Sequence, residues 1–274
     1  MSNNSEHFIT AELLDAVIGL SKAAGEKILS IYDTDFEVKD KGDKSPLTEA
    51  DMLSHRTICD GLSVLTPDIP ILSEESADVP YSVRKKWNRY WLVDPLDGTR
   101  EFIKRNGEFT VNIAFIEDHR SVLGVVYVPV TRLCYFARRG GNAFKQEDNR
   151  PAVHIRAKQT IAGNFIIAGS RSHGSEQQTR FINSLGSDTE LIAIGSSLKF
   201  CLVAEGRVDI YPRFGPTSEW DTAAAQCIVE ESGGIVTNTR FKPLLYNTRE
   251  SILNPGFLVI ADKSFDWEPY LSDL

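Results

Sequence analysis

Residues 91–99, WLVDPLDGT, join an apolar segment to a turn that carries two aspartates three positions apart. Pro95 and Gly98 favour a tight turn, in which both carboxylates and one backbone carbonyl can face the same point. Hard cations such as Mg²⁺ prefer oxygen ligands of this kind. Thr99 stands at an expected helix start, where free N–H groups and the helix dipole favour a phosphate. An ordinary capped turn has the same pattern, so this stretch alone leaves both interpretations open.

Short apolar runs on both sides of this stretch predict strands. They are expected at residues 71–73, 90–94, 110–116, 122–128 and 133–139 in the first half, and at 165–169, 190–194, 208–212, 234–237 and 257–261 in the second. The alternation of Val111, Ile113 and Phe115 predicts a strand with one buried face and one polar face.

Apolar residues at helical spacing predict helices around these strands. The first runs from Thr10, its N-cap, to about Tyr32, and the second begins at Thr48 with a T-x-x-D start. Further helices are expected near 176–185, 196–206 and 219–232.

The alternation of strands and helices in the second half predicts an α/β arrangement. The polar, proline-containing stretch at 145–153 is the best candidate for a boundary, which divides the chain into domains 1–150 and 151–274. The predicted fold class is therefore α/β, a layered α+β sandwich, with an active site between the two domains.

The composition of the 274-residue chain is that of an ordinary globular protein, with 42% hydrophobic and 25% charged residues. Its net charge of −8 repels nucleic-acid backbones, which argues against a polymeric DNA or RNA partner. A small anionic substrate is compatible with this charge if bound cations reverse the local field. The four cysteines lie far apart without a CxxC pair, which argues against a disulfide framework or a zinc site. Cys201 and Cys227 fall among apolar residues at helical spacing, which predicts buried free thiols.

Signals for export or membrane insertion are missing from the sequence. No basic stretch followed by an apolar one opens the chain, and no apolar run is long enough to span a membrane. These features predict a cytoplasmic protein without integral membrane association. Peripheral association with the cytoplasmic side of the inner membrane stays open, although no amphipathic or lipidation signal supports it. The sequence does not fix the oligomeric state.

Three further acidic groups stand at the ends of expected elements. Glu74 follows the apolar run 71–73, Asp221 opens an alanine-rich helix, and Asp51 lies in the first turn of the second helix. Singly, each is best explained as an acid that interacts with a helix dipole and solvent. Together they gather carboxylates at element ends, where the clefts of α/β folds form.

Four motifs resemble, in order, those of the lithium-sensitive, magnesium-dependent inositol monophosphatase superfamily. They are SPLTEAD at 45–51, ILSEES at 71–76, WLVDPLDGTREF at 91–102 and SEWDTAAAQCIVEESGG at 218–234. The resemblance covers nearly the whole chain, and the last two motifs are highly specific as a pair. It implies alternating layers of helices and sheets, and a phosphomonoesterase that uses two or three Mg²⁺ ions.

The same resemblance implies a set of metal ligands. Glu74, Asp94 and the carbonyl of Leu96 would hold one Mg²⁺, and Asp94, Asp97 and Asp221 would hold a second. A third, weaker ion would lie near Glu74. Two divalent ions about 3.5–4 Å apart can acidify a water and stabilise negative charge on the leaving oxygen.

The resemblance also implies how phosphate and water are held. Gly98 and Thr99 would meet the scissile phosphate, and Asp51 with Thr99 would orient or deprotonate the attacking water beside Glu74. Because a water acidified by a metal ion needs only a weak base, no covalent phosphoenzyme is required. The metal-binding residues that also contact the substrate by this resemblance are Glu74, Leu96, Asp97 and Asp221.

The second half carries the residues that point to a substrate. Where inositol monophosphatases have a glutamate that accepts hydrogen bonds from inositol, this chain aligns Arg213, and a guanidinium suits a second phosphate. Lys199 and Ser196, at an expected helix start, and His173, after a strand, complete a set that resembles CysQ-type 3'(2'),5'-bisphosphate nucleotidases. Taken singly, each could instead be an ordinary surface, ion-pair or capping residue.

The implied reaction is hydrolysis of adenosine 3',5'-bisphosphate, a by-product of sulfate assimilation, to AMP and phosphate. 3'-Phosphoadenylyl sulfate is a further candidate substrate. One alternative is an inositol or sugar phosphatase on the same scaffold, which the missing glutamate argues against. Another is a phosphometabolite-binding protein without catalysis, which should have lost a metal ligand or the Thr99–Asp51 pair, whereas all are present.

Overall fold

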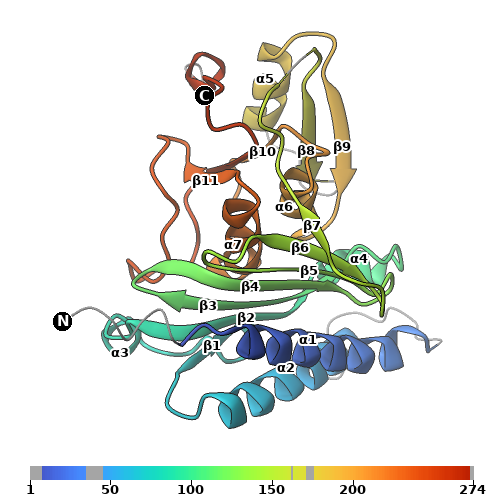
Figure 1. The fold of residues 1–274 in the computed structure, drawn as a ribbon, viewed down its shortest axis with the longest axis vertical. Helices are drawn as coiled ribbons and strands as arrows, with labels where there is room; N and C mark the ends of the chain where they lie inside the picture. Colours follow the sequence, from blue (N-terminus) through green and yellow to red (C-terminus); the bar gives the residue numbers. More distant parts are fainter. Residues whose placement is uncertain (1–7, 35–45, 162, 171–175, 272–274) are drawn as a thin grey trace.

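Two long helices open the part of the chain that the structure describes, which in this computed structural model is residues 8–34, 46–161, 163–170 and 176–271 (Figure 1). Helix α1 (Ala11–Tyr32) is capped as predicted, since Thr10 Oγ1 accepts a hydrogen bond from the Leu13 N–H at 3.2 Å. Helix α2 (Pro46–Leu65) begins two residues before the predicted start, because proline is well suited to the first turn of a helix. Asp51 therefore lies in the second turn of α2 rather than the first.

The first sheet has the order β1-β2-β3-β4-β5-β6-β7 within the described residues. Strands β1 and β2 run parallel, and every later neighbour is antiparallel. The strands are β1 (Ile71–Ser73), β2 (Arg89–Asp97), β3 (Thr110–Glu117), β4 (Arg120–Val128), β5 (Leu133–Arg138), β6 (Ala143–Glu147) and β7 (Val153–Ile155). The short helices between them are η1 (Glu74–Ser76), α3 (Tyr81–Arg84) and α4 (Thr99–Ile103).

Strand β3 is buried along its whole length, so the predicted polar face is wrong. Val111, Ile113 and Phe115 pack with α1 and α2, whereas Ala114 and Ile116 pack with the apolar cluster on the other side of the sheet. The period of two that the sequence shows is real, but it separates two buried faces. Helices α1 and α2 cover one face and α7 (Ala223–Glu231) lies on the other (Figure 1).

The second sheet has the order β11-β12-β10-β8-β9 in the described part of the chain, with β10, β8 and β9 parallel. Its strands are β8 (Ile166–Ser170), β9 (Glu190–Ile194), β10 (Ile210–Arg213), β11 (Ile235–Asn238) and β12 (Phe257–Ile260). The remaining helices are α5 (Glu176–Ser184), α6 (Leu198–Ala204), η2 (Glu219–Asp221) and η3 (Glu268–Tyr270). The five predicted strands and three predicted helices of this half are thus present, with shifted ends.

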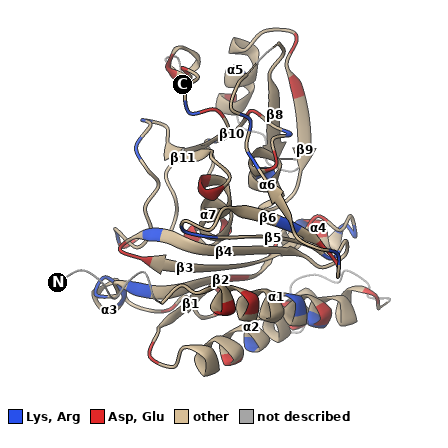
Figure 2. Cartoon of the chain, viewed as in Figure 1, with Lys and Arg blue, Asp and Glu red and all other residues tan. Residues whose placement is uncertain are grey.

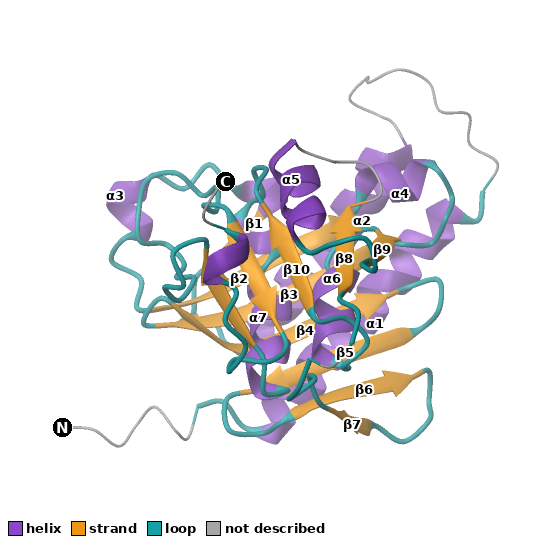
Figure 3. Cartoon of the chain, turned by 90° about the horizontal axis from the view of Figure 1, so that it is seen from above, coloured by secondary structure: helices purple, strands orange, loops and turns teal. Residues whose placement is uncertain are grey.

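Helices α6 and α7 form the layer between the two sheets (Figures 1 and 3). Alanines let α7 approach the first sheet closely: a Cβ on Gly124 of β4 would lie 2.0 Å from the carbonyl oxygen of Ala224. On the outer side of the second sheet, Phe181 of α5 packs against Ile167 and Ile210. The order of layers is α1/α2, first sheet, α6/α7, second sheet and α5, which matches the predicted layered α/β fold.

The polar stretch 145–153 forms part of the hairpin between β6 and β7, in which Lys145 pairs with Val153. The sequence did not predict these two strands. The chain passes from the first sheet to the second between Ile155 and Ile166, a few residues beyond the predicted boundary. The division into domains 1–150 and 151–274 stays a prediction.

Two other sequence expectations concern the cysteines and the membrane. All four cysteines are free, and Cys134, Cys201 and Cys227 are buried, which confirms the prediction of unpaired thiols. Among the described helices, none combines the length and the apolarity needed to cross a bilayer. Helices α1 and α2 both contain acidic and basic residues (Figure 2).

Candidate active site

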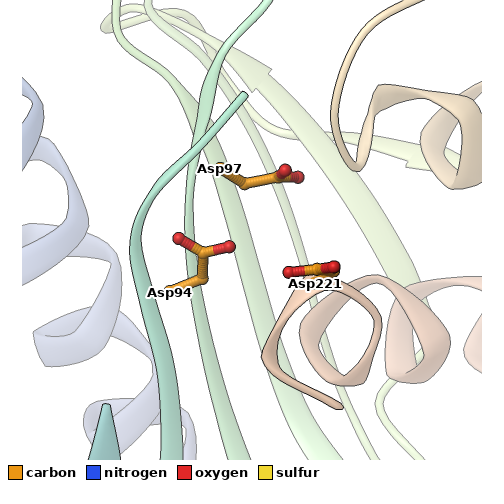
Figure 4. Close-up of side chains that lie close together, drawn as sticks. All are labelled: Asp94, Asp97 and Asp221. Atoms are coloured by element: carbon orange, nitrogen blue, oxygen red, sulfur yellow. The ribbon is translucent and has the colours of Figure 1, made fainter. Parts of the chain in front are cut away.

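The end of β2 is bent by an extra residue. Asp94 pairs with Asn112 of β3 and Asp97 pairs with Thr110, so three steps along β2 oppose two steps along β3. Such a bulge turns side chains that would otherwise point to opposite faces. Asp94 and Asp97 therefore reach the same side of the strand, toward the layer of α6 and α7 (Figure 4).

Two hydrogen bonds hold the bulge. The Leu96 N–H donates to Asp94 Oδ1 at 3.1 Å, and the hydroxyl of Ser54 on α2 donates to the carbonyl of Pro95 at 2.7 Å. Both groups of the Ser54 bond are buried, where an unpaired carbonyl would be costly. Leu96 lies between the two aspartates with its side chain buried.

Asp221 comes to the same place from the second half of the chain. It ends η2, where the Ser218 N–H donates to Asp221 Oδ2 at 2.8 Å in a capping box. One carboxylate oxygen from each of Asp94, Asp97 and Asp221 lies within 4.8 Å of the others (Figure 4). The structure thus brings together three of the predicted metal ligands, which we call the acidic cluster.

Burial and mutual repulsion disfavour the charged state of the acidic cluster. Burial, followed by the neighbouring carboxylates, raises the pKa of Asp94 well above its ordinary value. Burial, followed by the charge of Asp97, raises the pKa of Asp221 to about 7. Burial also raises the pKa of Asp97, and Lys199 and Ser197 oppose that increase. Carboxylates crowded in this way need a cation or protons to remain together.

Asp97 is held by one of its two oxygens. Its Oδ2 accepts the Ser197 N–H at 2.7 Å, and the Ser197 hydroxyl lies 2.9 Å away. The Thr110 hydroxyl and the Asn112 amide also reach Asp97 Oδ2, each at 3.4 Å. The other oxygen remains for the acidic cluster.

Glu74 and Asp51 lie on the α2 side of the acidic cluster. Glu74 is exposed at the start of η1, yet surrounding protein atoms and then the charges of Asp97 and Glu75 raise its pKa to about 7. Asp51 is buried on α2, and burial followed by Glu75 and Glu74 raises its pKa to about 9. In the absence of a cation, both carboxyl groups therefore hold a proton more strongly than an ordinary carboxyl group does.

The predicted pairing of Asp51 with Thr99 is not seen as a hydrogen bond in the described part of the chain. Asp51 Oδ1 is buried without a hydrogen-bond partner there, and Thr99 is exposed. A joint role for the two residues in orienting water therefore stays a prediction.

Gly98 and Thr99 form the start of α4, as predicted. Gly98 is the N-cap with a φ of 97°, a left-handed conformation that side chains rarely tolerate. A Cβ there would also lie 3.2 Å from the Glu108 carbonyl oxygen. The turn after Asp97 thus requires glycine, which exposes the backbone beside the acidic cluster.

A cleft of about 290 Å³ extends from the acidic cluster toward the second sheet. Asp97, Gly98, Thr99 and Asp221 line it, and we call this set of residues its metal end. The lining also includes Ser196, Lys199, Tyr211 and Arg213, and we call this set its cation end. The predicted phosphate and second-anion residues therefore share one cavity, although they come from opposite halves of the sequence.

Lys199 and Arg213 place two cations in the lining of this cleft. The Lys199 ammonium is buried and donates to the carbonyls of Ser196 at 2.6 Å and Ile194 at 3.3 Å. Burial lowers the pKa of Lys199 to about 8, although the negative charge of Asp97 acts in the opposite direction and raises it. Arg213 donates from Nη2 to the Pro216 carbonyl at 3.2 Å, and its buried Nε has no hydrogen-bond partner within the described residues. An unpaired guanidinium N–H in a cleft favours an anionic ligand.

A model of the inositol monophosphatase family matches residues 10–264. The chain belongs to this family. The 3'(2'),5'-bisphosphate nucleotidase CysQ of Salmonella typhimurium is 50% identical over 250 residues, which cover 90% of this chain and 99% of that protein. The protein of the same name from Escherichia coli K12 is 49% identical over 251 residues, covering 90% and 99%.

A solved structure leads to the same family. CysQ from Bacteroides thetaiotaomicron, a bacterial member of the inositol monophosphatase family, is 41% identical and superposes with a TM-score of 0.84. The match covers 94% of this chain and 100% of that one. The family and the layered fold that the four sequence motifs indicated are therefore confirmed.

The acidic cluster has the donor set that this family needs. Its members generally use Mg²⁺, and carboxylate oxygens are the ligands that Mg²⁺ prefers. No histidine or cysteine joins Asp94, Asp97 and Asp221 in the cluster among the described residues. The crowding that raises the pKa values of these carboxylates is the condition that a divalent cation relieves.

Some residues of the site were missed by sequence reasoning, and one predicted residue cannot be placed. His173 lies outside the described residues. Ser54, Asn112 and Ser197 were not predicted, although Asn112 stands out as a polar residue in the middle of an otherwise apolar strand. A buried polar side chain in such a strand needs a partner, which is the signal that could have drawn attention to it.

Proposed function

We propose that this chain hydrolyses the 3'-phosphate of adenosine 3',5'-bisphosphate to give AMP and phosphate. The observation that carries the proposal is the single cleft, which Asp97 and Asp221 of the acidic cluster line together with Lys199 and Arg213. A substrate with two phosphates can engage both ends at once. Relatives that are 49–50% identical over nearly their whole length are named bisphosphate nucleotidases.

The acidic cluster would hold Mg²⁺ through Asp94, Asp97 and Asp221, with Glu74 and the carbonyl of Leu96 completing the predicted set. Bound Mg²⁺ would supply Lewis-acid chemistry, lowering the pKa of a water and neutralising charge on the leaving oxygen. In this proposal Gly98 and Thr99 hold the transferred phosphate. The backbone there is open because glycine has no side chain, and α4 begins at Thr99.

Asp51 is the group that we assign to the attacking water, together with Thr99. Its buried Oδ1 has no hydrogen-bond partner among the described residues, and burial and neighbouring carboxylates raise its pKa to about 9 in the absence of a cation. The negative charge of nearby Glu74 contributes to the raised pKa of Asp51. A bound cation would lower this pKa and leave the carboxylate free to accept a proton. The proton that leaves the water would thus pass to the protein without a covalent phosphoenzyme.

Arg213 and Lys199 would hold the second phosphate. A guanidinium can donate two parallel hydrogen bonds to phosphate oxygens, whereas the ammonium of Lys199 supplies mainly positive charge beside them. Ser196, which lines the same cleft, can add a hydroxyl. His173 stays a predicted substrate contact. 3'-Phosphoadenylyl sulfate also carries a 3'-phosphate and a charged 5' group, so it could bind the same two sets of residues. A cytoplasmic location remains part of this proposal.

The test is phosphate release from adenosine 3',5'-bisphosphate and from inositol 1-phosphate, measured side by side with Mg²⁺ and with a chelator. The proposal predicts a strong preference for the nucleotide and no turnover in the chelator. Preference for the inositol ester would contradict the assignment of the Arg213 end. Turnover that survives the chelator would contradict the assignment of the acidic cluster.

A further inference from the structure

Ser197 touches the acidic cluster from the turn between β9 and α6. Its N–H donates to Asp97 Oδ2 at 2.7 Å, and its hydroxyl lies 2.9 Å from that oxygen and 2.8 Å from the carbonyl oxygen of Asp221. One buried residue thus contacts a ligand from the first sheet and a ligand from η2. These two ligands are 124 residues apart in the chain, by subtraction of their numbers, so neither local element fixes their relative position.

Neighbouring side chains determine the direction of the Ser197 hydroxyl. Thr110 Oγ1 donates to Asn112 Oδ1 at 3.0 Å, which orients the amide so that Asn112 Nδ2 faces Ser197. Asn112 Nδ2 then donates to Ser197 Oγ at 2.9 Å. Because the hydroxyl accepts from Asn112, its own proton must go to Asp97 or to the Asp221 carbonyl.

These donors act on one oxygen of Asp97 only. The Ser197 N–H satisfies Oδ2, and the Ser197 hydroxyl adds a second donor in one of its two orientations. Groups that bind one oxygen of a ligating carboxylate in this way fix the direction of the carboxylate and the charge it presents to a cation.

The turn that carries Ser197 is itself restrained on both sides. The Ser196 hydroxyl donates to the Glu108 carbonyl at 2.8 Å, and Lys199 Nζ donates to the Ser196 carbonyl at 2.6 Å. Ser196 has a φ of 42°, a left-handed conformation that is costly without such support. Ser196 and Lys199 line the cleft, whereas Ser197 is not among the residues described as lining it.

We propose that Ser197 is a positioning residue that sets the geometry of the divalent-cation site by aligning Asp97 with Asp221. The inference rests on the proposed function only in taking the acidic cluster as a cation site. It predicts that Ser197 acts on cation binding and on kcat, and not on the affinity for substrate. Mutation of a residue that hydrogen-bonds to a metal ligand typically changes metal affinity by about 10- to 100-fold.

The test measures Mn²⁺ binding in the absence of any substrate, because Mn²⁺ takes the same oxygen ligands as Mg²⁺ and is detected directly by electron paramagnetic resonance. Ser197→Ala should weaken Mn²⁺ binding by about tenfold or more. Ser197→Thr, which keeps the hydroxyl, should recover most of that loss. Ser121→Ala is the matched control, since Ser121 is a buried serine of β4 whose hydroxyl has no partner within the described residues.

Kinetics separate positioning from substrate binding. At saturating Mg²⁺, Ser197→Ala should lower kcat and leave the substrate KM within about threefold of wild type, while Arg213→Ala should raise the KM and leave Mn²⁺ binding unchanged. Equal Mn²⁺ affinity in Ser197→Ala, Ser121→Ala and wild type would overturn this inference alone. Wild-type protein that binds no Mn²⁺ would overturn it together with the assignment of the acidic cluster. Tight, Ser197-dependent Mn²⁺ binding without nucleotide turnover would support it and overturn the proposed substrate instead.

Discussion

The two ends of the cleft are built in different ways. At the metal end, Asp94 and Asp97 lie in one bulge of β2, and Ser197 links Asp97 to Asp221 from the second half of the chain. At the cation end, Lys199 and Arg213 come from α6 and β10, and each side chain bonds to a backbone carbonyl three residues away. The carboxylates of the metal end are thus linked to one another, whereas each side chain of the cation end is held separately by its own nearby backbone.

This difference has a consequence for function. A linked set of ligands loses its geometry if one member changes, so it suits the chemistry that a whole family shares. Side chains that are held separately can be exchanged without disturbing that set, so they suit selection among substrates. The two ends should therefore respond differently to mutation.

The largest effect is expected from Asp97→Asn. Removing a ligand charge from the acidic cluster should cost several kcal/mol of transition-state stabilisation, which corresponds to about a thousandfold in kcat/KM for every phosphate ester tested. Asp60→Asn, at an exposed aspartate of α2, is the matched control. Steady-state phosphate release measures the effect, and a loss below tenfold would show that Asp97 does not hold an essential cation.

Arg213→Ala should have a smaller and selective effect. Loss of a charge-assisted contact of about 1.5–3 kcal/mol should reduce kcat/KM for adenosine 3',5'-bisphosphate by about 10- to 100-fold. Turnover of inositol 1-phosphate, which has no second phosphate, should change by less than about threefold. Arg207→Ala, at an exposed arginine before β10, controls for the loss of a charge. Equal loss on both substrates would remove the distinction between the two ends.

Ser54→Ala tests how the metal end is held. The substitution leaves the buried Pro95 carbonyl without its donor, and we expect the free energy of unfolding to fall by about 1–3 kcal/mol. Urea denaturation measures this change. Thr57→Ala is the control, because the Thr57 hydroxyl donates to Leu53 within the same helix. An equal effect of the two substitutions would contradict a special role for Ser54 in the bulge.

The pH dependence of stability should have opposite signs at the two ends. Asp221 and Glu74 have a pKa of about 7 in the folded protein, against ordinary values near 4. Between these values the folded state binds more protons than the unfolded state, so these groups lower the stability of the metal-free protein as pH rises from about 4 to 7. Lys199 has a pKa of about 8, below its ordinary value, so its contribution to stability rises with pH above about 8.

Thermal unfolding in a chelator at pH 5 and pH 8 measures the effect at the metal end. The drop in Tm from pH 5 to pH 8 should be smaller in Asp221→Asn than in wild type. Mg²⁺ should raise the Tm of wild type more at pH 8 than at pH 5. An identical drop in both proteins would contradict the assignment.

Much of the fold and of the metal end could be predicted because the signals lie in short stretches. The Thr10 cap, the apolar runs and the D-P-L-D-G turn each express their geometry within a few residues. The hairpin of β6 and β7 was missed because both strands are only partly buried and carry polar side chains, and β7 is the edge of the first sheet. The polar face predicted for β3 was wrong because Thr110 and Asn112 are satisfied internally, by contacts that no pattern displays.

The contacts of the cation end and of the supporting residues were harder to predict, because they form only in the folded chain. A sequence that shows Lys199 does not show that its ammonium is used to hold the Ser196 carbonyl. Ser197 resembles any serine before a helix until the fold brings Asp97 and Asp221 to it. Contacts between residues far apart in the chain depend on the assembled layers, which the local pattern does not contain.

The identity of the product tests most directly the claim that the two ends of the cleft hold different phosphates. Adenosine 3',5'-bisphosphate is incubated with the protein and Mg²⁺, and the mononucleotide formed is identified by phosphorus nuclear magnetic resonance. With the 3'-phosphate at the acidic cluster and the 5'-phosphate at Lys199 and Arg213, the product is adenosine 5'-phosphate alone. Formation of adenosine 3'-phosphate would contradict this assignment of the two ends.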